Sequence, residues 1–304
     1  MNKVLIVGGP TGIGKSEVAV RLAQRYNATI VGADSMQIYR GMNIGTGKIS
    51  EREKCGIPHA MIDIISPNTQ YSVQNYVQDA QKAIGAAHRQ RQLPIVVGGT
   101  GLYINALIHE QNFATAEPNV LMREKYMTIF REHGAEYLHD LLQKIDPQSA
   151  ENIAVNDVKR VIRALEIYDQ TGKAKSTAVA SRQSTYDIRF YVLQTERERL
   201  YDRIDRRVDA MLQNGWIQEV LELRPFWGCR SMEAIGYREI IAALQADRDP
   251  YEMRETIQRN TRRYAKRQIT FFKWIQADKK AYVNEDFFQN ITATADKWVE
   301  EGNL

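Results

Sequence analysis

A glycine-rich turn near the start of the chain carries the strongest chemical signal. Gly9, Gly14, Lys15 and Ser16 satisfy the pattern G-x-x-x-x-G-K-[ST] between an apolar segment and a helical one. Glycines let successive backbone N–H groups point inward at phosphate oxygens, and the start of the helix adds positive potential. Lys15 supplies a point charge, and Ser16 is placed to ligate Mg²⁺. The predicted phosphate-binding residues are Gly9, Pro10, Thr11, Gly12, Ile13, Gly14, Lys15 and Ser16.

This loop specifies phosphate oxygens and leaves open the compound that carries them. Nucleotide-hydrolysing motors and switches also need a strand that ends in an acidic residue beside the Mg²⁺. The natural candidate strand, residues 95–97, runs into Gly98, Gly99 and Thr100 and ends without a carboxylate. The sequence therefore favours an enzyme that transfers a phosphoryl group, or one that uses the loop to hold a departing phosphate.

An acidic residue closes the second predicted strand, in the stretch ADSMQIYRG. In a parallel sheet ligands bind beyond the carboxyl ends of the strands, so Asp34, the phosphate loop and Thr100 are expected to share one crevice. A carboxylate there can take a proton from an incoming nucleophile. The competing interpretation is an Asp that caps its own turn, but the polar neighbours Ser35 and Gln37 and the loop opposite favour function. The acceptor could still be a hydroxyl, as in a small-molecule kinase, or an amine, as in an alkyl transferase.

A helix predicted in the stretch ERERLYDRIDRRVDAML carries a row of arginines. Arg199, Arg203 and Arg207 lie four residues apart and therefore on one face. Arginines that converge on a phosphate site would stabilise negative charge as it develops there. The alternative is a solvated face on which these arginines pair with the acidic residues nearby, which are Glu196, Asp202, Asp205 and Asp209. The spacing alone does not decide between the two.

A basic helix is predicted near the C-terminus, because residues 256–277 contain no acidic side chain. Arg259, Arg263 and Lys266 can share a face, and such a stripe suits a polyphosphate backbone. A second basic cluster lies at residues 159–163. In a chain whose formal net charge is only +4, this distribution favours a nucleic acid over a small metabolite.

Aromatic residues accompany the basic ones in the same C-terminal stretch. They are available either to pack in the core or to stack on bases. For Phe271, Phe272 and Trp274 we expect the core.

Short apolar strands alternate with helical patterns through the first third of the chain. Strands are predicted at residues 3–7, 28–35 and 93–101, and helices at residues 15–26 and 71–92. Such alternation is typical of a parallel sheet with crossover helices. From about residue 113 to 187 helical periodicity replaces the strands, with a helix that Asp146 caps and a polar loop at residues 173–187. A strand is expected again at residues 188–195, and the remainder is expected to be helical.

The predicted fold class is therefore α/β, with a P-loop NTPase-like parallel sheet core and an α-helical insertion domain. The core comprises residues 1–112 and 188–304, and the insertion comprises residues 113–187. A chain of 304 residues with 43% hydrophobic composition can bury such a core. The only cysteines, Cys55 and Cys229, have no metal-ligand spacing, and no stretch resembles a signal peptide or a membrane span. We expect a cytoplasmic protein and a monomer.

Taken together, these segments resemble the tRNA dimethylallyltransferase family. The matching stretches follow the family's order and span most of the chain: GGPTGIGKS, ADSMQIYRGMNIGTGK, IPHAMIDI, VVGGTGLYINAL, NDVKRVIRALEIY, AIGYREI and TRRYAKRQITFFK. The phosphate loop is shared by many families, whereas DSMQIYRGMNIGTGK and RRYAKRQIT are far more specific.

The resemblance implies transfer of a dimethylallyl group from dimethylallyl diphosphate to N6 of adenosine 37, next to the anticodon, in tRNAs that read codons beginning with U. It implies that the loop holds the diphosphate, with Mg²⁺ at Ser16. Asp34 would be the general base for the adenine amine, and Thr100 would orient the adenine or the diphosphate. Arg207 is our choice for the arginine on the leaving group, with Arg203 the alternative.

The resemblance also implies a set of tRNA contacts, which come from the loop after the second strand, the insertion and the basic C-terminal helix. They are Asp34, Ser35, Met36, Gln37, Thr100, Arg123, Lys159, Arg160, Val161, Ile162, Arg163, Arg263, Lys266, Arg267, Gln268 and Lys273.

Three alternatives stay open at this stage. A kinase would use ATP at the same loop and deprotonate an alcohol with Asp34, and a relative of the cytokinin-forming enzymes would prenylate free AMP. The helical insertion and the basic C-terminal helix argue against both, since a small acceptor needs neither. A non-catalytic RNA-binding protein would not need an intact phosphate loop with a carboxylate opposite.

Overall fold

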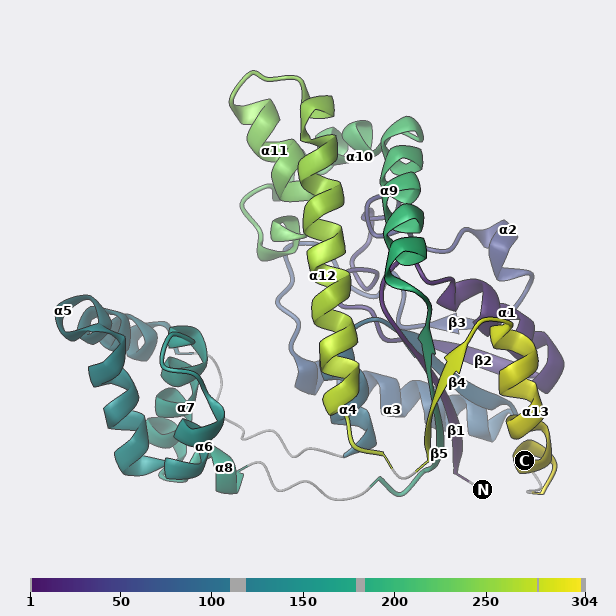
Figure 1. The fold of residues 1–304 in the computed structure, drawn as a ribbon, viewed down its shortest axis with the longest axis horizontal. Coiled ribbons are helices and arrows are strands. Elements are labelled where there is room, and N and C mark those ends of the chain that lie inside the picture. The colour runs from purple at the N-terminus through teal and green to yellow at the C-terminus, as the bar shows by residue number, and fades with distance from the viewer. Residues whose placement is uncertain (1, 110–118, 179–183, 278, 302–304) are drawn as a thin grey trace. The chain divides into compact units, whose positions relative to one another are not determined.

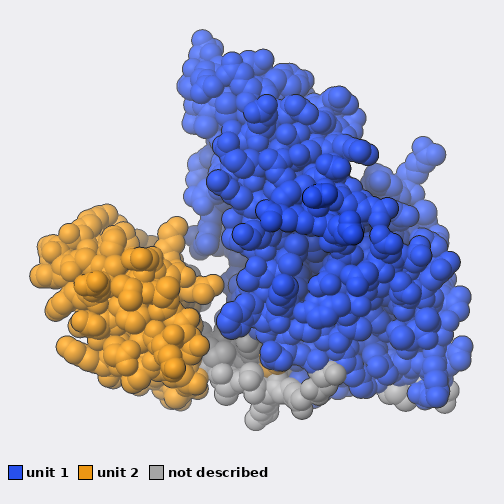
Figure 2. Space-filling model, in the orientation of Figure 1, with its two compact units in different colours: residues 1–108, 184–304 blue, residues 109–183 orange. Residues whose placement is uncertain are grey.

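The computed structural model describes residues 2–109, 119–178, 184–277 and 279–301. The chain divides into two compact units, which Figure 2 shows in different colours. Unit 1 comprises Met1–Ile108 and Ser184–Leu304, and unit 2 comprises His109–Gln183. Within the described residues, no helix is both long enough and apolar enough to cross a membrane.

Unit 1 is built on a parallel sheet of six strands in the order β3-β2-β4-β1-β5-β6 (Figure 1). The central strands β1 and β4 are buried along their whole length, as expected for strands that helices cover on both faces. The predicted α/β fold with a parallel sheet is confirmed. The strands are β1 (Lys3–Gly8), β2 (Ala28–Gly32), β3 (His59–Ala60), β4 (Leu93–Gly98), β5 (Asp187–Gln194) and β6 (Lys280–Asn284).

Both edge strands differ from the sequence prediction. The expectation that the remainder of the chain after β5 is helical is wrong, because β6 pairs in parallel with β5 through Phe190 and Lys280. Only Val283 of β6 is buried, so the strand lacks the apolar pattern that predicts a strand. The strand β3 is even shorter, pairing His59 with Ile30 of β2.

Helices of unit 1 pack around this sheet, and α9 and α12 lie alongside one another as a long pair (Figure 1). Arg262 of α12 binds Asp205 of α9 at 2.5 Å, and Arg254 binds Asp209 at 2.6 Å. The helices are α1 (Lys15–Tyr26), α2 (Glu51–Lys54), α3 (Val73–Arg89), α4 (Gly101–Ile108), α9 (Arg197–Gln213), α10 (Trp216–Glu222), α11 (Tyr237–Gln245), α12 (Arg254–Trp274) and α13 (Phe287–Glu300), with short 3-10 turns at Arg224–Phe226, Arg230–Glu233 and Pro250–Met253.

Unit 2 is helical and has its own core, in which Leu138, Leu142 and Leu165 are buried. The predicted cap is confirmed, since the Asp146 side chain accepts a hydrogen bond from the backbone N–H of Ser149 at the start of α6. The predicted loop at residues 173–187 contains a short helix instead, and residues 179–183 of that loop lie outside the described residues. The helices are α5 (Val120–Ile145, broken at Gly134), α6 (Pro147–Asn152), α7 (Val158–Thr171) and α8 (Lys175–Ala178).

Candidate active site

A cavity of about 760 Å³ lies at the carboxyl ends of β1, β2 and β4, within unit 1. This is where ligands bind in parallel sheets, because the loops after the strands meet there. The cavity brings together the phosphate loop, the residue after β2, the segment at 46–49 and the helices α9 and α12. Its polar lining includes Thr11, Lys15, Ser16, Asp34, Gln37, Arg207, Tyr264 and Gln268, and its apolar lining includes Val20, Ile49 and Val97.

The phosphate loop connects β1 to α1 and has the form that its pattern predicts. Gly14 immediately precedes α1 with φ of 101°, a left-handed conformation that a side chain would strain. No side chain caps the helix, so the N–H groups of its first turn are not used by a cap. Lys15 Nζ donates to the carbonyl oxygen of Pro10 at 2.8 Å. An anion on the loop would therefore meet both backbone donors and an ammonium group.

The ammonium of Lys15 is held in an unusual electrostatic environment. Burial lowers the pKa of Lys15 to about 8, the carboxylate of Asp34 opposes this shift, and the guanidinium of Arg207 adds to it. Two cations close to one carboxylate leave an excess of positive charge in the cavity. Such a site gains stability when a multiply charged anion binds.

Asp34 combines the two roles that the sequence set against one another. Its Oδ1 accepts hydrogen bonds from the backbone N–H groups of Met36 (2.9 Å) and Gln37 (3.3 Å), which makes the turn after β2. Its Oδ2 accepts no hydrogen bond from any residue that the structure describes. Because Asp34 lines the cavity, one oxygen is engaged in the turn while the other is available to a ligand.

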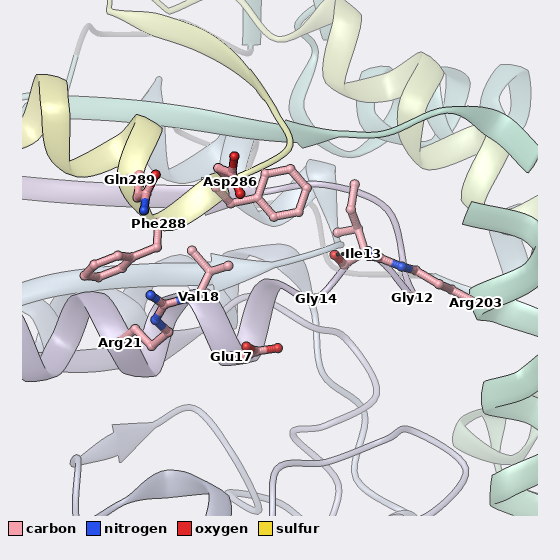
Figure 3. A pocket seen from close by; sticks show the side chains of 11 residues that line it. Gly12, Ile13, Gly14, Glu17, Val18, Arg21, Arg203, Asp286, Phe288 and Gln289 are labelled. Atoms are coloured by element: carbon pink, nitrogen blue, oxygen red, sulfur yellow. Dashed lines mark hydrogen bonds between the residues drawn. The ribbon is translucent and has the colours of Figure 1, made fainter. Parts of the chain in front are cut away.

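The three arginines of the predicted row on α9 lie in three different environments. Arg199 binds Glu285 at 2.7 Å and is exposed. Arg203 donates to the carbonyl oxygen of Ile13 at 3.3 Å and lines a second cavity, of about 400 Å³, which shares Gly12 and Gly14 with the first but is not lined by Asp34. Figure 3 shows Arg203 there with Arg21 and Asp286.

Arg207 lines the same cavity as Lys15 and Asp34. Its Nη1 lies 3.5 Å from Thr11 Oγ1, and its Nη2 lies 3.4 Å from the carbonyl oxygens of Thr46 and Gly47. A Cβ at Gly47 would come within 1.6 Å of Nη2, so only glycine permits this approach. Burial lowers the pKa of Arg207, and Asp34 partly offsets the shift. Of the two candidate arginines, Arg207 is the one that shares the cavity with the carboxylate.

Helix α12 contributes one face to the wall of the cavity. Gln268 is buried; its Oε1 accepts from the N–H of Thr11 and its Nε2 donates to the carbonyl oxygen of Gly99, each at 2.9 Å. Gln268 is predicted to contact tRNA, but its side chain amide is already hydrogen-bonded to the phosphate loop and to the loop after β4. Tyr264, one turn earlier, is another aromatic residue of this basic stretch, and it lines the cavity as well. Burial, with a contribution from Asp34, raises the pKa of Tyr264 to about 12.

The opposite side of α12 is exposed and strongly basic. Arg263, Lys266, Arg267 and Lys273 are exposed and form no ion pair with any residue in the described part of the chain. The guanidinium of Arg267 lies 5.7 Å from the centre of the Tyr264 ring. Of the aromatics expected in the core, Phe272 is buried and Phe271 is half-buried. The expectation is wrong for Trp274, which is 77% exposed because it follows Phe272 by two residues and so lies on the other face of the helix.

The remaining site residues on unit 1 lie in the loop after β2. The Oγ1 of Thr100 accepts a hydrogen bond from the N–H of Ser35 at 3.0 Å, which ties the end of β4 to this loop, and Thr100 is not among the residues that line the cavity. Met36 packs on an apolar cluster beside the site. The side chain of Gln37 donates to the carbonyl oxygens of Thr46 and Gly47 at 3.2 and 3.3 Å.

Of the tRNA contacts predicted at the start of α7 in unit 2, two side chains are exposed and two are buried. Lys159 and Arg160 are exposed at the start of α7. Val161 and Ile162 are buried in the core of the unit, so a contact of their side chains with tRNA is contradicted by their position on the inner face of the helix.

Arg123 and Arg163 of unit 2 share an acidic partner. Glu166 has no exposed side-chain surface and binds Arg163 at 2.7 Å and Arg123 at 3.2 Å. It also accepts from the N–H of Asn119 at 2.6 Å. Burial alone would raise the pKa of Glu166, but these hydrogen bonds outweigh it and lower that pKa.

Comparison with known proteins gives consistent matches along the chain. The sequence model of the family described as IPP transferase matches residues 37–274, and a model described as isopentenyl transferase matches residues 1–64. A tRNA dimethylallyltransferase of Caldanaerobacter subterraneus is 42% identical over 292 residues, covering 93% of this chain and 92% of that protein. A tRNA dimethylallyltransferase of Thermoanaerobacter sp. is 39% identical over 291 residues, with the same coverage of 93% and 92%.

Solved structures agree with these sequence matches. The full-length tRNA isopentenylpyrophosphate transferase of Bacillus halodurans superposes with a TM-score of 0.73 at 39% identity, covering 99% of this chain and 98% of that one. A eukaryotic dimethylallyltransferase acting on tRNA gives a TM-score of 0.84 at 28% identity, covering 99% of this chain and 80% of that one. The chain therefore belongs to the IPP transferase family, the family of the tRNA dimethylallyltransferases.

Proposed function

We propose that this protein transfers the dimethylallyl group of dimethylallyl diphosphate to N6 of adenosine 37 in tRNAs that read codons beginning with U, and releases diphosphate. The observation that supports the proposal is that Lys15, Arg207 and Asp34 line one cavity in a member of this family. A phosphate site that faces a carboxylate suits a reaction in which one group leaves as another is deprotonated.

The phosphate loop holds the leaving group in this scheme. The loop N–H groups, Lys15 and Arg207 neutralise the diphosphate as the bond between the allylic carbon and oxygen breaks. The allylic fragment carries partial positive charge at that moment. The apolar lining at Val20, Ile49 and Val97 keeps water away from it.

Asp34 acts on the nucleophile. The exocyclic amine of adenine is a weak nucleophile, because its lone pair is delocalised into the ring. The free Oδ2 of Asp34 accepts a hydrogen bond from this amine and takes its proton as the N6–carbon bond forms. The products are N6-dimethylallyl-adenosine in the tRNA, diphosphate and a proton.

A Mg²⁺ ion fits the site as a companion of the diphosphate. Ser16 is exposed in the first turn of α1, where its hydroxyl can serve as a ligand, and the described residues contain no cluster of three or more His, Cys, Asp or Glu side chains. Phosphate oxygens and water would therefore supply the other ligands, which is how Mg²⁺ is usually held beside phosphates. The ion would neutralise part of the charge of the leaving group.

The tRNA contacts in this scheme come from exposed cations. On α12 these are Arg263, Lys266, Arg267 and Lys273, and on unit 2 they are Lys159 and Arg160. Adenosine 37 is stacked in the anticodon loop and must turn outward to reach a carboxylate at the cavity wall, which costs a few kcal/mol. Phosphate contacts to the exposed cations offset that cost. Tyr264 offers an aromatic ring in the cavity for the displaced base.

A labelled donor tests the proposal directly. The protein is given labelled dimethylallyl diphosphate and Mg²⁺ with unmodified tRNA, with tRNA that carries guanosine at position 37, or with AMP. We expect label in the unmodified tRNA alone. Label in AMP alone would show that the acceptor is a free nucleotide and not tRNA. The absence of label from every acceptor would contradict the proposal. A parallel assay with ATP and no tRNA tests the kinase alternative, for which we expect no phosphoryl transfer.

A further inference from the structure

A buried carboxylate outside the cavity binds the backbone of the loop at residues 43–47, which contacts Arg207. Glu219 of α10 is 7% exposed. Its Oε2 accepts from the N–H groups of Asn43 (2.8 Å) and Ile44 (2.7 Å), and its Oε1 accepts from the N–H of Gly45 (3.1 Å). Successive N–H groups that converge in this way form a concave anion site, here filled by a side chain of the same chain.

A fourth donor completes the environment of this carboxylate. The hydroxyl of Tyr237, at the start of α11, donates to Oε1 of Glu219 at 2.6 Å. Burial and the charge of Glu219 raise the pKa of Tyr237, so the phenol keeps its proton and stays a donor. Four donors and no acceptor fit a carboxylate, which can only accept.

The held loop is in contact with the active site on its other side. The carbonyl oxygens of Thr46 and Gly47 follow directly after the three bound N–H groups. Both accept from Arg207 Nη2 at 3.4 Å, and both accept from the side chain of Gln37. The segment at residues 43–47 therefore links Glu219 behind it to Arg207 in front of it.

Packing leaves this loop little freedom to move. A Cβ at Gly45 would lie 2.0 Å from Nε1 of Trp216 and 2.6 Å from the ring of Tyr237. Within the stretch GMNIGTGK, Gly45 thus lies against the stretch AIGYREI that contains Tyr237. Both stretches carry the family resemblance, and the chemistry of the phosphate loop explains neither of them.

We propose that Glu219 is a positioning residue, which holds the loop at residues 43–47 so that its carbonyl oxygens aim Arg207 at the phosphate loop. The inference rests on the proposed function for the identity of the ligand, a diphosphate. A bound loop restricts the rotamers of Arg207 before the ligand arrives, and a preorganised cation binds an anion more tightly than a mobile one.

Binding of inorganic diphosphate with Mg²⁺ tests this without requiring turnover. Glu219→Gln keeps the size of the side chain but presents an N–H₂ group to N–H donors. Glu222→Gln is the matched control, since Glu222 lies on the same helix and is exposed. We expect about tenfold weaker binding in E219Q and less than about twofold change in E222Q. Tyr237→Phe, which removes one donor and spares the loop, should weaken binding by about twofold to threefold.

A double-mutant cycle separates positioning from a general loss of structure. In an Arg207→Ala background, E219Q should weaken diphosphate binding by less than about twofold, because the group that Glu219 positions is gone. Amide hydrogen exchange should accelerate at residues 43–47 and not in α1. Two results would overturn the inference: an unchanged diphosphate affinity in E219Q with only a lower melting temperature, or an equal weakening with and without the Arg207 side chain. If the wild type binds diphosphate but transfers no label to tRNA, the proposed function fails and this test still decides the role of Glu219.

Discussion

Asp34 uses its two carboxylate oxygens differently, and this explains why the residue could be interpreted in two ways. Oδ1 belongs to the turn after β2, and Oδ2 is available in the cavity. A substitution that removes the whole carboxylate would therefore disturb both the loop and the chemistry. Asparagine separates them, because it keeps an acceptor for the N–H groups of Met36 and Gln37 but has no basic oxygen.

We predict that Asp34→Asn lowers the rate of transfer by about 10²-fold to 10⁴-fold, the contribution typical of a general base. The tRNA dissociation constant and the melting temperature should change little, since the turn is retained. Single-turnover rates and tRNA binding measured on the same preparation provide the check. Turnover within about threefold of the wild type would remove Asp34 from the role of base.

Lys15 should make diphosphate binding depend on pH. With its pKa lowered to about 8 in the free protein, Lys15 loses its proton as the pH rises through that value, and binding of an anion must then restore the proton. Affinity for diphosphate should therefore fall above about pH 8, by up to about tenfold per pH unit. Folding without ligand depends on pH in the opposite direction. Between about pH 8 and 10.5 Lys15 is protonated in the unfolded chain but not in the folded one, so the free energy of unfolding rises with pH across this range. Below about pH 8 the buried charge of Lys15 lowers the free energy of unfolding.

Titration calorimetry from about pH 7 to about 9.5, a range that spans the Lys15 pKa of about 8, measures how diphosphate affinity changes with pH. Lys15→Arg is the control, because its guanidinium stays charged throughout and the titration of diphosphate itself is common to both proteins. The wild type should lose more affinity over this range than K15R. Parallel curves for the two proteins would show that Lys15 does not titrate as described.

Helix α12 serves several partners because its faces differ. One face pairs with α9 through Arg262 and Arg254. A second face carries Tyr264 and Gln268 into the cavity wall. The exposed side retains Arg263 and Lys266 without acidic partners among the residues described. A single element can thus connect the chemistry of the cavity to an RNA backbone.

We predict that the double substitution Arg263→Gln and Lys266→Gln weakens tRNA binding and flattens its dependence on salt. Each cation that no longer contacts a phosphate should reduce the slope of log K against log salt concentration by about one. Lys82→Gln with Arg248→Gln provides a control of equal charge, since those side chains are exposed but paired with Asp79 and Glu252. Filter binding at several salt concentrations measures the slope. An equal slope in both double variants would place the tRNA elsewhere.

At the scale of the whole molecule, the chain consists of two units that each have a core. In unit 2 the buried Glu166 binds both Arg163 and Arg123. Its pKa is lowered from 4.5, so the stability that it provides is present above that value and is lost as the pH falls through the lowered one. The arginines are partly exposed, which limits what the pairing contributes.

We predict that Glu166→Gln destabilises unit 2 by about 2–3 kcal/mol at pH 7, because two arginines lose their buried partner. The difference in the free energy of unfolding between E166Q and the wild type should shrink in acid, where Glu166 is protonated in both the folded and the unfolded protein. Glu151→Gln, an exposed position on α6, is the control. Amide exchange resolved along the sequence distinguishes the units. Equal loss of protection in unit 1 and unit 2 would contradict two independently stabilised cores.

The phosphate loop, Asp34 and the parallel sheet could be predicted because their signals are local. A glycine pattern between a strand and a helix needs no knowledge of distant contacts, and strand ends converge by topology. The spacing alone left a row of three arginines, and the family resemblance reduced the choice to Arg207 with Arg203 as the alternative. Which arginine reaches the cavity depends on how α9 packs.

The burial of Val161 and Ile162 could have been predicted, because Val158, Val161, Ile162 and Leu165 follow the spacing of the apolar face of a helix. The role of Glu219 could not, because it depends on contacts between residues far apart in sequence, such as that between Gly45 and Tyr237.

The central claim is that the phosphate loop cradles the departing half of the prenyl donor while Asp34 faces the acceptor. A crystal structure of the protein with Mg²⁺ and the unreactive thio-analogue of dimethylallyl diphosphate tests it most directly. We predict that the diphosphate lies on the N–H groups of the loop within hydrogen-bonding distance of Lys15 and Arg207, with the prenyl chain directed toward Asp34. Clear density for the diphosphate in any other part of the protein, with the loop empty, would contradict the account.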